Sequence, residues 1–107
     1  MIMTQGWLPI GSVVHLQGRQ GLLMVTSVMA EDAETAQLFE YAAVQYPNGV
    51  TDGENSVLFN RDAIDCVYFL GLQDAEGLRF QDILAVQEEA FEAERLSRVE
   101  AAEGALA

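Results

Sequence analysis

Among the side chains that could act as a nucleophile or a general base, histidine and cysteine are the types that react most readily near neutral pH, and each occurs once, as His15 and Cys66. Histidine exchanges protons near neutral pH, and a cysteine thiolate attacks electrophiles or binds metals. His15 has no Asp, Ser or Cys beside it, so we interpret it as a surface residue of a strand; a catalytic dyad assembled by the fold is the alternative. Cys66 lies in an apolar run, where free cysteines are commonly buried as small hydrophobes. We therefore assign no catalytic residue and expect a protein that is not an enzyme.

Carboxylates are the next candidates, because hard divalent cations prefer oxygen ligands. Four of them surround a predicted strand and two turns, but their spacing does not match an EF-hand loop. One histidine and one cysteine are too few for a structural zinc site within the chain. We assign no metal and no cofactor, and adventitious cation binding is the most that these carboxylates predict. They are Asp52, Glu54, Asp62 and Asp65.

Aromatic side chains are candidates for binding a partner rather than for catalysis, because Trp and Tyr often anchor protein interfaces. Trp7 has two interpretations: it seals one end of the domain, which we favour, or it anchors a partner. Core filling competes with partner binding for the others. The candidate partner-binding residues are Trp7, Tyr41, Tyr46, Phe80 and Phe91.

The elements that must position these residues follow from periodicity. Two glycines in Gly18-Arg19-Gln20-Gly21 predict a tight reversal between the first two strands, and both faces of the second strand are apolar, so it should be central or wrapped by other elements. Residues 30–35 include three acidic residues and show no periodic spacing of apolar residues, which predicts a loop. Tyr46-Pro47-Asn48-Gly49 is the strongest turn signal. A short turn at 60–63 leads into the last strand. The predicted strands cover residues 13–16, 22–29, 38–46, 57–60 and 64–72.

From Asp74 onward the apolar residues are spaced as in an α-helix. Asp74 is the expected N-cap, and the helix is expected to start as late as Leu78. An apolar face is expected to pack on the sheet or against a partner, and the tail beyond Val99 is expected to fray. The fold class is therefore α+β: a small, strongly bent antiparallel sheet or half-open barrel of about five strands with a C-terminal amphipathic helix. We expect one domain over residues 7–96, with flexible ends at 1–6 and 99–107. The apolar face comprises Phe80, Ile83, Leu84, Ala90 and Phe91.

The charge balance limits the classes of partner that this protein is expected to bind. Seventeen acidic residues stand against five arginines and no lysine, for a net charge of -12. Such a field repels phosphate backbones and anionic lipids, so we expect neither a nucleic-acid nor a membrane partner. A stacking platform built from Tyr41, Tyr46, Tyr68 and Phe69 would lack the cations that hold phosphates. A basic protein partner would be attracted. The sequence shows no signal peptide and no long apolar span, which predicts a cytoplasmic protein.

Several segments in a fixed order resemble a family of small bacterial proteins known as domain of unknown function 4176. The resemblance covers about Trp7 to Phe91, and the order of segments is more specific than any one motif. The chain differs at Arg19 and Gln20, where family members are commonly richer in lysine. The segments are Leu8-Pro9-Ile10-Gly11-Ser12-Val13-Val14, then Tyr46-Pro47 with Gly49, then Phe59-Asn60 with Ile64-Asp65.

The resemblance implies an accessory role, because members are often encoded beside type VII secretion loci and their LXG toxins. We expect a non-catalytic cytoplasmic adaptor or targeting factor that binds an LXG effector or its small helical partners. An acidic immunity protein that blocks a toxin domain is the alternative. A small ligand-binding barrel or enzyme, with a pocket lined by His15 or the tyrosines, is the third hypothesis. The family has no established catalytic residues to transfer, and the sequence leaves the oligomeric state open.

Overall fold

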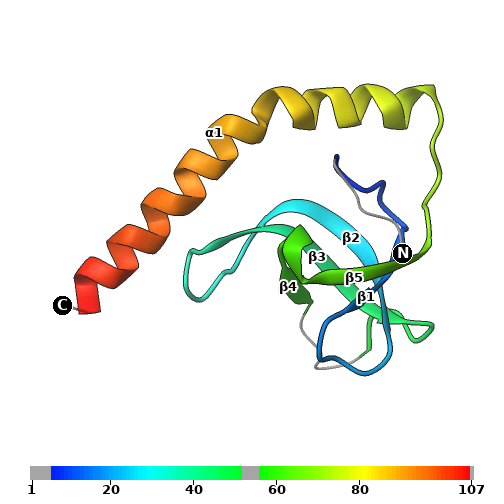
Figure 1. Ribbon diagram of the computed structural model, residues 1–107, viewed down its shortest axis with the longest axis horizontal. Coiled ribbons are helices and arrows are strands. Elements are labelled where there is room, and N and C mark those ends of the chain that lie inside the picture. The colour runs from blue at the N-terminus through cyan, green and yellow to red at the C-terminus, as the bar shows by residue number, and fades with distance from the viewer. Residues whose placement is uncertain (1–5, 52–55, 107) are drawn as a thin grey trace.

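The computed structural model describes residues 6–51 and 56–106 and confirms the α+β class: five antiparallel strands followed by one long helix (Figure 1). A short 3-10 turn at Arg61–Ala63 precedes the last strand. The strands are β1 (Val13–Leu16), β2 (Leu22–Glu31), β3 (Leu38–Tyr46), β4 (Val57–Phe59) and β5 (Ile64–Phe69), and the helix is α1 (Ala75–Leu106).

The strands form one open sheet in the order β4-β3-β2-β1-β5, so the domain is not a closed barrel. Every pairing is antiparallel. The two glycines of the β1–β2 turn take positive φ, 74° at Gly18 and 82° at Gly21, which explains why glycine is needed at both ends of this reversal. β2 lies in the middle of the sheet, as its two apolar faces predicted.

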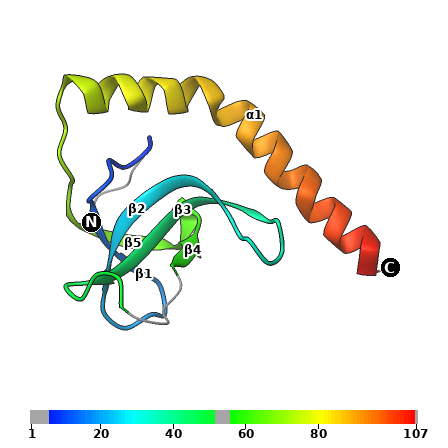
Figure 2. The same ribbon diagram turned by 180° about the vertical axis from the view of Figure 1, so that it is seen from behind.

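The core lies on the inner face of the bent sheet, between the sheet and α1 (Figures 1 and 2). Alternate residues of each strand point to it, because successive strand side chains face opposite ways. Each fully buried aliphatic side chain contributes about 1.5–3 kcal/mol by leaving water. The innermost side chains are Val14, Leu23, Val25 and Tyr41.

The predicted element boundaries hold within a few residues, with two differences. β2 continues to Glu31, so its last residues occupy part of the predicted loop at 30–35. α1 starts at Ala75 and runs 32 residues to Leu106, well past Val99. Asp74 caps it as expected, because its Oδ1 accepts a hydrogen bond of 2.8 Å from the Gly77 N–H. Residues such as Ala101 and Ala102 favour helix strongly, which explains the longer C-terminal end.

The helix face that meets the sheet differs from the predicted one. Leu84 is buried and Phe91 is partly buried, as predicted, but Phe80, Ile83 and Ala90 are exposed. The inner face is instead a stripe of mixed polarity, with neighbouring members three or four residues apart. This stripe comprises Gln81, Leu84, Glu88, Phe91, Arg95 and Arg98.

Polar contacts of α1 with the N-terminal segment and with the β2–β3 hairpin explain this orientation of the helix. Near its start, the Gln81 Nε2 donates to the Trp7 carbonyl at 2.9 Å. Toward its end, Arg98 pairs with Glu31 at the tip of the β2–β3 hairpin, and the Gln37 Nε2 donates to the Arg98 carbonyl at 3.2 Å. The helix therefore crosses over the sheet and rests on the hairpin tip (Figure 2).

Candidate functional site

Trp7 lies at the centre of the contact between sheet and helix, with 7% of its surface exposed. Its ring centroid is 5.6 Å from that of Tyr41 and 6.0 Å from that of Phe91, in an edge-on arrangement with Phe91. The central guanidinium carbon of Arg61 lies 4.8 Å from the ring centroid, a cation–π contact. These contacts agree with the interpretation that Trp7 seals one end of the domain. Because α1 covers the ring, Trp7 can contact a partner only if α1 moves away.

Tyr41 is also part of the core. Its ring stacks on Phe59, with centroids 5.6 Å apart, and none of its surface is exposed. The hydroxyl oxygen accepts a 2.9 Å hydrogen bond from the Leu8 N–H, so the N-terminal segment is tied to β3. Burial raises the pKa of Tyr41, because the charged phenolate is disfavoured away from water.

Of the five candidate partner-binding residues, Tyr46 and Phe80 are the most exposed, at 48% and 45%. Phe80 borders a small cleft beside Pro9 and Leu72, on the side where α1 begins. Tyr46 lies at the end of β3 and borders a different cleft, on the outer face of the sheet. The structure therefore separates the five candidates into a buried aromatic cluster and two exposed residues at different places.

The outer-face cleft has a volume of about 410 Å³ and lies over β1, β2, β3 and β5. Tyr68 and Phe69 both border it, with 64% and 62% of their surfaces exposed. Consecutive residues of a regular strand point to opposite faces. Here the pairing with β1 shifts register between Val67 and Phe69, and this bulge directs both rings toward one cleft. The lining residues are Gly11, Val13, Leu22, Met24, Tyr46, Tyr68 and Phe69.

The sequence predicted Tyr68 and Phe69 as part of a possible stacking platform, and Tyr68 also as one of the tyrosines that would line a ligand pocket, but neither residue was among the candidate partner-binding residues. The available signal was the nearly unbroken apolar run at 64–72 in a strand that is now seen to be an edge of the sheet. Large exposed aromatics gathered on one face mark binding sites more often than chance exposure does. We therefore take the outer-face cleft as the candidate functional site.

His15 has a partner that the sequence order did not reveal. Its Nδ1 lies 2.7 Å from the Asp65 Oδ1, across the β1–β5 pairing, and Cys66 is the direct cross-strand neighbour of His15. The hydrogen bond to Asp65 raises the pKa of His15. Both side chains of the pair are about one-third exposed.

The carboxylates do not gather into a metal site among residues 6–51 and 56–106, where no cluster of three or more potential ligands is found. Asp65 is engaged by His15. Asp62 lies in the 3-10 turn before β5. The other two candidates, Asp52 and Glu54, lie outside the described residues.

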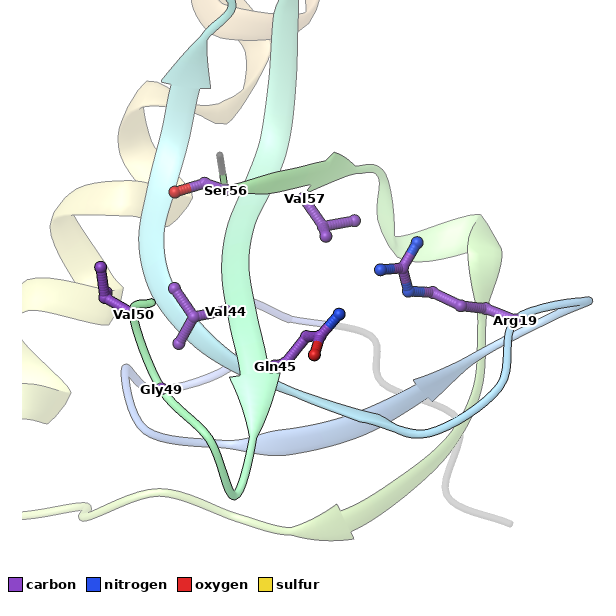
Figure 3. A pocket seen from close by; sticks show the side chains of 7 residues that line it. All are labelled: Arg19, Val44, Gln45, Gly49, Val50, Ser56 and Val57. Carbon is purple, nitrogen blue, oxygen red and sulfur yellow. The ribbon is translucent and has the colours of Figure 1, made fainter. Parts of the chain in front are cut away.

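A third cleft, of about 270 Å³, lies where the β1–β2 turn approaches the end of β3 (Figure 3). The Arg19 side chain extends into it toward Gln45. Val44 and Val57 contribute apolar surface. The described lining offers the Arg19 cation and the Ser56 hydroxyl, but no histidine, cysteine or carboxylate that could activate that hydroxyl, so we assign it no chemistry.

Taken together, the structure is a small α+β domain: an open five-stranded sheet, one long helix over its inner face, and a cleft with exposed aromatic side chains on its outer face. Residues 7–80 match the family described as "Domain of unknown function (DUF4176)", and the chain belongs to that family. The match spans the whole sheet and the first turns of α1. No curated protein and no solved structure matches the chain. Within the described residues, α1 is too polar to span a membrane, and no other helix is long enough to do so.

Proposed function

We propose that this protein is a non-catalytic adaptor that binds another protein in the cytoplasm. The observation that carries the proposal is the outer-face cleft, where a bulge directs Tyr68 and Phe69 to the same side and leaves both largely exposed. Burying two such rings against a partner removes a large apolar area from water, and aromatic residues supply much of the energy of protein interfaces.

The proposed partner is a type VII secretion effector of the LXG class or one of its small helical partners. The support for this identity is the membership in the family, and a location beside such loci is what the resemblance described above implies for its members. Charge supports a basic partner, because a net charge of -12 accelerates association with a positively charged surface.

Coexpression tests this proposal. The chain is produced together with the effector and small helical proteins encoded beside it, and the mixture is separated by size-exclusion chromatography. We expect one complex to elute ahead of each component. Separate elution of all components at micromolar concentration would contradict the adaptor role.

The surplus of acidic residues favours a second candidate function, that of an immunity protein which covers a basic toxin site. Cells that express the toxin domain should then survive when this chain is coexpressed. An adaptor predicts binding without protection, so the survival assay separates the two functions. The third hypothesis, a ligand-binding barrel, finds less support, because Trp7, Tyr41 and Leu84 fill the inside of the bent sheet.

A further inference from the structure

We propose that the outer-face cleft seats an amphipathic helix of the partner, with apolar residues toward the cleft and lysine or arginine on its remaining surface. This inference rests on the proposed function as an adaptor and adds the site, the conformation and the charge of the bound segment. Four features carry it: the width of the cleft, the apolar outer face of the sheet, the irregular edge of β5, and the net charge of the chain.

The width of the cleft fits a helix. Tyr46 on β3 and Phe69 on β5 border it, and β2 and β1 lie between these two strands. Neighbouring strands are about 4.8 Å apart, so three spacings separate the two aromatic residues by about 14 Å. A helix with its side chains is about 10–12 Å across. Val13, Leu22 and Met24 form an apolar floor between the aromatics, on which a helix can place residues three and four positions apart.

A sheet with an apolar outer face also favours a helical occupant. The inner face of this sheet is already covered by α1, and helices are the usual cover for a sheet that is apolar on both sides. A partner helix on the outer face would complete three layers, with the sheet in the middle.

The edge of β5 is a poor template for an added strand. Strand addition needs a regular row of unpaired backbone groups. β5 shifts register twice against β1, on either side of Cys66 and Val67, and bulges of this kind bend an edge and interrupt pairing. The cleft therefore offers side-chain contacts over four strands rather than a continuous backbone edge.

Charge argues for a basic partner and against a second copy of this chain. Two copies would bring together two net charges of -12. Four of the five arginines, Arg61, Arg79, Arg95 and Arg98, already pair with acids of the same chain. The acidic surplus is thus left to attract cations from outside, and lysine or arginine on the flanks of a bound helix, beside its apolar stripe and nearest to this chain, would supply them.

A designed peptide tests the inference on the full chain. The probe is a helical peptide of about 18 residues made of Leu, Ala and Lys, with Leu at every third or fourth position. A permuted peptide of the same composition, whose Leu residues are spread around the helix, is the control. Fluorescence anisotropy of labelled peptide gives Kd, and NMR amide shifts of the 15N-labelled protein locate the contact.

Two cleft variants, Tyr46→Ser and Phe69→Ser, are compared with Val86→Ser, which removes an exposed apolar side chain from α1 outside the cleft. We expect each cleft variant to raise Kd about tenfold or more and Val86→Ser to change it by less than about twofold. Amide shifts of wild-type protein should concentrate on Val13, Met24 and Phe69, a readout that holds even if one variant fails to fold.

The inference is overturned if the patterned peptide does not bind, if the permuted peptide binds equally well, or if the amide shifts fall outside the cleft. It is also overturned if the effector complex forms and survives Phe69→Ser, in which case the adaptor function stands without this site. Conversely, peptide binding in the cleft without any complex with the coexpressed proteins supports the site and contradicts the adaptor function.

Discussion

The guanidinium of Arg61 lies over the ring of Trp7, with its central carbon 4.8 Å from the ring centroid. The same guanidinium donates to Glu40 on β3 at 2.9 Å and to Glu88 on α1 at 3.1 Å. One side chain thus joins the N-terminal segment, the sheet and the helix. Because the side chains of Arg61 and Glu40 are mostly shielded from water, their ion pair is screened less than surface ion pairs are.

Replacing Trp7 by alanine is expected to lower the free energy of unfolding by about 3–5 kcal/mol, because the ring fills the space between Tyr41 and Phe91. Urea unfolding followed by circular dichroism measures the loss. Trp7→Phe should retain more of the stability, since it keeps a ring and removes a buried indole N–H that has no hydrogen-bond partner among the described residues. Unchanged stability with lost partner binding would instead identify Trp7 as an anchor.

Arg61→Lys is expected to lower stability by about 1–2 kcal/mol, although it conserves the charge. Lysine lacks the planar fork that reaches Glu40 and Glu88 together while covering Trp7. Arg79→Lys is the matched control, because Arg79 forms an exposed pair with Glu76 one turn away on α1. That change should alter stability by no more than about 0.5 kcal/mol. Equal effects of the two substitutions in urea titrations would refute the special role of Arg61.

Gly71→Ala is expected to destabilise the domain by more than about 2 kcal/mol. A Cβ there would lie 2.3 Å from the Ile10 carbonyl oxygen and 2.9 Å from the Ser12 nitrogen, so the backbone itself would have to shift. The shift would also disturb the 2.9 Å hydrogen bond from the Gly71 N–H to the buried Ser12 hydroxyl.

Gly104→Ala is the control for Gly71→Ala. Gly104 lies within α1, and an added Cβ would meet nothing within 4 Å. Alanine should therefore raise helix stability by up to about 1 kcal/mol. Thermal melts of both variants measure the opposite shifts in Tm, and a tolerated Gly71→Ala would show that the two segments approach less closely than described.

The pair of His15 and Asp65 predicts a pH dependence of stability. The hydrogen bond that the His15 imidazole donates to the Asp65 carboxylate raises the pKa of His15 in the folded state, so folding favours the protonated imidazole. The added stability is then fully present below the unfolded pKa of about 6.5 and is lost as pH rises through the folded value. Melts between about pH 5 and 8.5 should show a decline in Tm that Asp65→Asn reduces. A decline of equal size in that variant would assign it to other groups.

Much of the fold follows from local signals in the sequence. The glycines at 18 and 21, the Tyr46-Pro47-Asn48-Gly49 turn and the Asp74 cap depend on neighbouring residues only, and the structure has each where it was predicted. The central place of β2 followed from its two apolar faces. Periodicity and turn chemistry are local, so they can be read without knowing the tertiary contacts.

The orientation of α1 and the candidate site were less predictable, because both depend on residues distant in sequence. The apolar pattern placed Phe80 and Ile83 on the inner face, but the contacts of Gln81 with Trp7 and of Arg98 with the β2–β3 tip rotate the helix away from it. The bulge that directs Tyr68 and Phe69 to one side arises from the β1–β5 register, which no pattern within β5 specifies.

The aromatic seal also has a consequence for how the chain folds during synthesis. Trp7 packs against Phe91, and Leu84 completes the same cluster, so residues from the beginning and the end of the domain share one core. The five strands can pair as soon as β5 has left the ribosome. The inner face of the sheet remains exposed to water, however, until the first half of α1 has also been synthesised. A nascent chain halted before Leu84 should therefore expose Tyr41 and Val25 and attract chaperones, whereas one released after Phe91 should not.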